Sequence, residues 1–94
     1  MKFPMEALQA IQYSGLALAE KKNHDYSSAV DVIGTTGVPG LGVRLFDKAS
    51  RLLSLTSGVQ QQVSDESIRD TAMDLMNYAT FLVAVLDGTW NPKP

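Results

Sequence analysis

The sequence contains no cysteine, a single histidine and no long hydrophobic run. Without cysteine, the chain has neither a disulfide framework nor a thiolate metal site, which fits a reducing cytoplasm. His24 has no second histidine or cysteine to share a metal ion with, so we expect a solvated side chain at a helix end, and neither zinc nor haem. The most apolar stretch, at 78–86, is too short to span a bilayer, and no basic segment followed by an apolar one opens the chain. We therefore expect a cytoplasmic protein without a membrane partner.

Size and charge further restrict the kinds of protein that this sequence can encode. A net charge of −2 lacks the dense cationic surface that non-specific nucleic-acid binding requires. A hydrophobic share of 45% and a mean hydropathy of −0.03 are ordinary for a globular protein. The 94 residues make a single domain, 1–94, whose stability margin alone is thin, so self-association is expected.

The spacing of apolar residues predicts an all-α fold, a three-helix bundle that assembles into a dimer or higher oligomer. The helices are expected at about 4–24, 41–56 and 64–87, with a glycine-rich loop at 27–40 and a tail at 88–94.

Glycines punctuate this pattern. Gly15 lies inside the first predicted helix, where it is unfavourable, and so indicates either a close helix crossing or a kink. The loop at 27–40 matches neither a P-loop nor a dinucleotide motif, so it is either a connector or a ligand-binding loop. Gly88 is expected to end the third helix, which Ser64 caps at its start.

Two opposed faces characterise the third predicted helix. An apolar seam, taken as the face toward the core, consists of Ile68, Ala72, Leu75, Ala79, Leu82 and Leu86. A polar stripe on the other side consists of Glu66, Asp70, Asp74 and Asn77. Beyond Asn77 this side becomes apolar at Phe81, Ala84 and Val85, so the acids are expected at the edge of an interface or groove rather than on an open face.

Cations on the second predicted helix could face that stripe. Arg44, Lys48 and Arg51 lie on one side of this helix. Either the acids bind Mg²⁺ and the cations bind the phosphates of a nucleotide, or the two sets pair with each other across packed helices. Both interpretations remain open, and Asp25, Tyr26 and Tyr78 are further residues that could either contact a ligand or serve the fold.

Three segments resemble a known family. "KNHDYSS", "VRLFDKASRLLSL" and "VSDESIRDTAMDLMNYATFL" are similar to the small helical nucleotide-modification-associated domain of phages and bacteria. The resemblance covers 22–86 and implies a nucleotide-binding protein, in the cytoplasm of the bacterial host if phage-encoded. Together with the charge pattern above, it makes candidate ligand or phosphate contacts of Lys22, Asp25, Tyr26, Arg44, Lys48, Arg51, Asn77 and Tyr78. The spacing of the acids makes Glu66, Asp70 and Asp74 the candidate Mg²⁺ ligands.

A looser likeness is to the all-α NTP pyrophosphatases of the MazG and dimeric dUTPase type, which are oligomers that use magnesium. Those enzymes carry a Glu-Glu-x-x-Glu cluster on an early helix, where this chain has Glu20 and then Asp25. Three functions are therefore open: Mg²⁺-dependent hydrolysis of a nucleoside triphosphate, sequestration of a nucleotide second messenger by a counter-defence protein, and a structural oligomerisation module.

Overall fold

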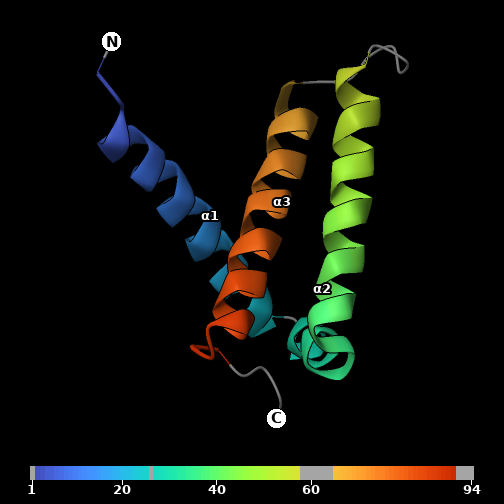
Figure 1. Cartoon of the computed structure of the whole chain (residues 1–94). Helices are drawn as coiled ribbons and strands as arrows, with labels where there is room; N and C mark the ends of the chain where they lie inside the picture. Colours follow the sequence, from blue (N-terminus) through green and yellow to red (C-terminus); the bar gives the residue numbers. More distant parts are fainter. Residues whose placement is uncertain (1, 26, 58–64, 91–94) are drawn as a thin grey trace.

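Three helices build the computed structural model (Figure 1). It describes residues 2–25, 27–57 and 65–90, and the side chains of 2–22, 37–57 and 67–90. No strand occurs within these described segments, so the predicted all-α class is confirmed. Assembly into an oligomer and the single domain at 1–94 stay predictions.

Helix α1 (Met5–Asp25) starts directly after a proline, as expected near 4–24. Proline suits the start of a helix because its missing N–H would have no partner there, and the Pro4 carbonyl accepts the Leu8 N–H at 3.0 Å. Gly15 is buried where α1 crosses α3 (Asp65–Leu86), which confirms the close crossing.

Helix α2 (Ser27–Thr56) begins much earlier than the sequence suggested. The expected loop at 27–40 is wrong, because this backbone is helical on both sides of a break at Gly37. The break has φ 61° and ψ −149°, a conformation that glycine tolerates. Pro39 lies in the first turn after the break, where its missing N–H costs no hydrogen bond. The glycines of this stretch therefore create a bend inside α2 instead of a long connector.

Helix α3, like α1, lies within one residue of its predicted bounds at each end. Its end is a Schellman motif, in which the Thr89 N–H donates to the Ala84 carbonyl at 3.0 Å and the Gly88 N–H to the Val85 carbonyl at 3.1 Å. Gly88 adopts φ 75°, which this motif requires. The expected tail therefore starts as an ordered turn through Trp90.

The helices do not pack equally (Figure 1). α2 and α3 lie side by side along most of α3, whereas α1 contacts α3 near Gly15 and diverges from it toward the N-terminus. The fully or nearly buried large apolar side chains of the described part are Leu41 and Leu55, both from α2. Two polar side chains of α3, Thr71 and Asn77, are buried with them.

The inward face of α3 differs from the expected one. In the predicted seam, Ala72, Ala79 and Leu86 are exposed, and the other three members are half-buried. Asp74 and Asn77, from the polar stripe, are half-buried and buried. The apolar period was read correctly, but a seam that is apolar does not have to face its own core.

None of the described helices is both long and apolar enough to cross a membrane.

Candidate functional site

One ion pair joins the acidic stripe of α3 to the cations of α2. Lys48 Nζ lies 3.1 Å from Asp74 Oδ2, with side chains 31% and 38% exposed. Among the residues that the structure describes, this is the single salt bridge. Both groups retain water contact, so the pair contributes at most about 1 kcal/mol to folding. The acids and cations singled out from the sequence are therefore brought onto the same surface at this point.

Two arginines flank this pair on α2. Arg44 and Arg51 are exposed, and they lie one turn before and about one turn after Lys48, on the same side of the helix. Neither forms an ion pair with any residue in the described part of the chain. Asp70, one turn before Asp74 on α3, is likewise exposed and without an ion pair there. The half-buried Lys48–Asp74 pair is thus flanked by two guanidinium groups and one carboxylate that form no ion pair in the described part of the chain.

Asn77 lies at the crossing of α1 and α3. Its Nδ2 donates to the Gly15 carbonyl at 3.0 Å, and its side chain is 8% exposed. Its Oδ1 is buried and has no hydrogen-bond partner among the described residues. A methyl group at Gly15 would lie 3.1 Å from this Oδ1 and 3.0 Å from Met76 Cε. Asn77 therefore fixes where α1 crosses α3, and a contact with ligand stays a prediction.

Tyr78 belongs to a chain of three aromatic rings. It meets Phe81 edge-on with the ring centroids 6.0 Å apart, and Phe81 meets Trp90 edge-on at 5.1 Å. Edge-to-face pairs at these distances contribute about 0.5–1.5 kcal/mol each beyond buried area. The apolar continuation of the polar stripe at Phe81, Ala84 and Val85 is half-buried within the chain, and an interface edge there stays a prediction. The sequence places Trp90 in the expected tail, although an aromatic residue two positions after the Gly88 cap was a usable signal.

The remaining predicted residues are not brought into this surface by the described coordinates. Lys22 is exposed near the end of α1. Asp25 and Glu66 have helical backbone, but their side chains fall outside the described part, as does all of Tyr26. In the described part, which does not include the Glu66 side chain, no three acids or histidines gather closely enough to hold a metal ion. The three-acid Mg²⁺ site stays a prediction.

The chemistry of the described residues suits a phosphorylated ligand. Arginine presents a planar pair of donors to phosphate oxygens, and the two arginines here are exposed and unpaired. Two carboxylates one turn apart match the one or two that a protein typically offers to Mg²⁺.

Comparison with known proteins gives one match. The model of the family described as nucleotide modification associated domain 1 matches residues 22–86. No curated protein and no solved structure matches the chain. The matched region contains the Lys48–Asp74 pair, both flanking arginines and the whole of α3. Since the match covers well over half of its length, the chain belongs to the nucleotide modification associated domain 1 family.

Proposed function

We propose that this protein binds a nucleotide on the polar surface shared by α2 and α3. Arg44, Lys48 and Arg51 bind the phosphates, and Asp70 and Asp74 lie beside them. The observation that carries the proposal is the Lys48–Asp74 pair at 3.1 Å, because it brings one cation of α2 to one acid of α3. Family membership supports a role connected with nucleotides.

The charges of this surface favour exchange of partners on binding. A half-exposed ion pair is weak, so a polyphosphate can take Lys48 from Asp74 at a cost of at most about 1 kcal/mol. Hydrogen bonds between a guanidinium group and a phosphate are charge-assisted and stronger than neutral ones. The release of Asp74 then leaves two free carboxylates next to the bound phosphates.

Mg²⁺ fits this donor set, since it binds through one or two carboxylates together with substrate phosphates. Asp70 and Asp74 would hold it, and its charge would neutralise the phosphate oxygens. The same two carboxylates would repel a polyphosphate in its absence, so binding is expected to depend on Mg²⁺.

Two forms of the proposal differ in turnover. In the first, the protein hydrolyses a nucleoside triphosphate to the monophosphate and pyrophosphate. In the second, it holds a nucleotide second messenger unchanged, as a counter-defence protein would. The acids present favour the second, because the early helix carries Glu20 and then Asp25 instead of the Glu-Glu-x-x-Glu cluster of the NTP pyrophosphatases. We also propose that the working unit is a homo-oligomer in the cytoplasm.

Titration calorimetry tests the proposal. Nucleoside and deoxynucleoside triphosphates, cyclic dinucleotides, cyclic oligonucleotides and ADP-ribose derivatives are each titrated with and without Mg²⁺. We expect at least one to bind, with an affinity that Asp70→Asn lowers in Mg²⁺ and that Asp87→Asn leaves unchanged. Asp87 is the matched control, because it is an exposed acid just beyond the other end of α3.

The ligand recovered after heating distinguishes the two forms. An unchanged ligand supports sequestration, and release of pyrophosphate supports hydrolysis. If no compound of the panel binds at any Mg²⁺ concentration, the proposed function is wrong.

A further inference from the structure

The N-terminal half of α1 has little to pack against in one chain. Phe3, Met5, Leu8 and Ile11 are between 40% and 67% exposed. We call residues 3–12 the α1 arm. It projects away from α2 and α3 in Figure 1, since α1 diverges from α3 on the N-terminal side of Gly15. Leu8 and Ile11 share the side of the helix on which Gly15 contacts α3, so they face the opening between the two helices.

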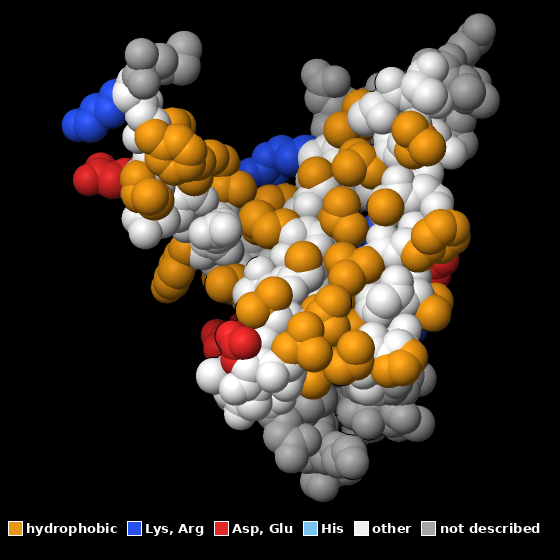
Figure 2. All heavy atoms as spheres, in the orientation of Figure 1, with side chains coloured by type: hydrophobic (Ala, Val, Ile, Leu, Met, Phe, Trp, Pro, Cys, Tyr) orange, Lys and Arg blue, Asp and Glu red, His pale blue; other side chains and the backbone are white. Residues whose placement is uncertain are grey.

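The opposite wall of this opening is also apolar. Val83 and Leu86 of α3 are 55% and 66% exposed, and Ala72 and Ala79 are exposed beside them. We call these four residues the outer face of α3. Figure 2 shows hydrophobic side chains gathered on this side of α3 and, separately, on the α1 arm.

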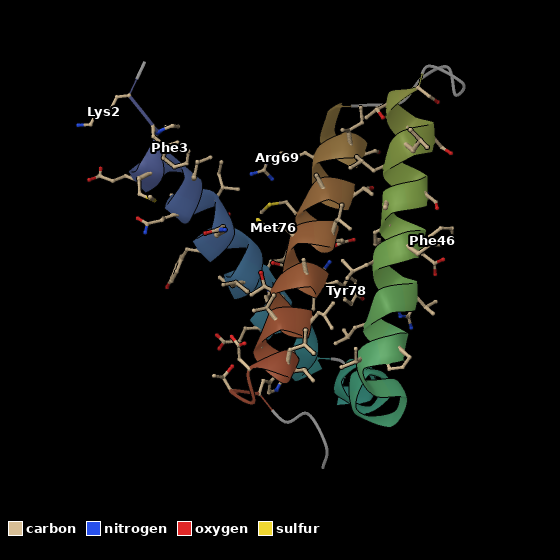
Figure 3. The ribbon with its side chains drawn as sticks, viewed as in Figure 1. Lys2, Phe3, Phe46, Arg69, Met76 and Tyr78 are labelled. Carbon is tan, nitrogen blue, oxygen red and sulfur yellow. The ribbon has the colours of Figure 1, made fainter. Side chains whose placement is uncertain are left out.

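A groove connects the two surfaces. It has a volume of about 510 Å³, and Gln12 of the α1 arm lines it together with Met76, Ala79 and Val83 of α3. In Figure 3, Met76 and Arg69 extend from α3 toward α1. A single charged residue, Asp87, lies at its edge. A second copy of this chain, which carries the same net charge of −2, could therefore enter the groove with little electrostatic repulsion.

The surface area of the chain is large for its mass. The chain exposes 7124 Å², whereas a folded monomer of 10.2 kDa exposes about 5,300 Å². Its radius of gyration is 14.7 Å, against about 12 Å for a compact domain of 94 residues. A permanent dimer interface buries about 2,000–5,000 Å² over both partners, and a chain with this much surface has enough to form one.

We propose that a second copy of this chain fills the groove, with the α1 arm of each copy lying on the outer face of α3 of the other. Under two-fold symmetry, the same pair of surfaces meets twice, so one arrangement covers both apolar surfaces of both copies. This inference deepens the oligomer part of the proposed function and does not depend on nucleotide binding.

Native mass spectrometry and light scattering of the full-length chain test the arrangement. We expect the wild-type protein at twice the mass of one chain, or at an even multiple of that mass. Leu8→Glu, in the arm, and Val83→Glu, on the outer face, should each reduce it to the mass of a single chain at the same concentration. Far-UV circular dichroism verifies that both variants remain helical.

Two matched controls introduce the same charge elsewhere. Tyr13 is 76% exposed on the opposite side of α1, and Phe46 is 72% exposed on the side of α2 away from α3 (Figure 3). Tyr13→Glu and Phe46→Glu should keep the wild-type mass. A wild-type protein at the mass of one chain overturns both this inference and the oligomer. A stable oligomer that Leu8→Glu and Val83→Glu leave intact overturns the α1–α3 surface alone, and neither result bears on the nucleotide titrations.

Discussion

The crossing of α1 and α3 can be tested by replacing two helical glycines with alanine, Gly15 in the crowded crossing and Gly42 on an open surface. At Gly42, on the exposed side of α2, a Cβ would have no atom within 4 Å. At Gly15, a Cβ would lie 3.0–3.1 Å from two methionine methyl groups and from Asn77 Oδ1. Alanine improves the helical propensity by up to about 1 kcal/mol at either position.

The two variants then differ in stability because the new methyl group meets close neighbours at Gly15 and none at Gly42. Gly42→Ala should raise the free energy of unfolding by about 0.5–1 kcal/mol, because nothing opposes the gain in propensity. At Gly15 the methionine ends can move, but the Asn77 amide must shift away from the Gly15 carbonyl to which it donates at 3.0 Å. Loss of a buried hydrogen bond with its donor left unpaired costs about 1–3 kcal/mol. Gly15→Ala should therefore be destabilising by about 0–2 kcal/mol.

Chemical denaturation of both variants, followed by circular dichroism at equal chain concentration, measures this difference. If the same variants are denatured by heat, a change of 1 kcal/mol in the free energy of unfolding corresponds to about 4–8 °C in Tm for a domain of this size. If Gly15→Ala were as stabilising as Gly42→Ala, Asn77 would not hold α1 against α3 as described. Equal concentrations are essential because self-association would itself shift Tm.

The remaining predictions concern the end of α3 and the ion pair. Gly88→Ala should lower the free energy of unfolding by about 1 kcal/mol, because alanine is strained at φ 75° in this Schellman motif; thermal denaturation measures it, and no loss would contradict the cap. Phe81→Leu should shift the fluorescence of Trp90, the sole tryptophan, since the two rings meet edge-on at 5.1 Å; an unchanged emission spectrum would mean that the turn does not pack on α3. A double-mutant cycle with Lys48→Met and Asp74→Asn should give a coupling of at most about 1 kcal/mol that salt weakens; a larger, salt-insensitive coupling would indicate a buried structural pair and count against a ligand-exchange surface.

Local signals predicted the parts of the fold that depend on local chemistry. The end of α3 follows from a glycine at Gly88, and the close crossing follows from a glycine in the middle of α1; Ser64, the expected N-cap, lies outside the described residues. These features depend on the backbone within a few residues, so the sequence reports them directly.

The inward face of α3 depends on tertiary packing and was predicted only in part. An apolar seam can pack against its own domain or against a second chain, and the sequence alone does not distinguish these. Asn77 is buried because the Gly15 carbonyl satisfies its Nδ2, and Thr71 because its hydroxyl donates to the Ser67 carbonyl at 2.9 Å. The helix at 27–36 was missed because its glycines were treated as a loop signal, whereas helical propensity is a weak guide that packing overrides.

The candidate site, like the inward face of α3, was predicted only in part. The facing of Asp74 and Lys48 was one of two alternatives raised by the sequence, and the structure pairs them. What the pattern could not supply is the separation of the two helices, which decides whether the charges neutralise each other or remain available. The exposure of Arg44 and Arg51 leaves them available in the described part of the chain.

The central claim, that the cationic side of α2 binds the phosphates of a nucleotide, is tested most directly by calorimetry on Arg44→Ala/Arg51→Ala. Arg69→Ala is the matched control, because Arg69 is also an exposed arginine and extends toward α1 instead of α2 (Figure 3). For the nucleotide that the wild-type protein binds, the account predicts an affinity at least tenfold lower in the double variant and unchanged in the control. Equal affinity in the double variant and the wild type would contradict it.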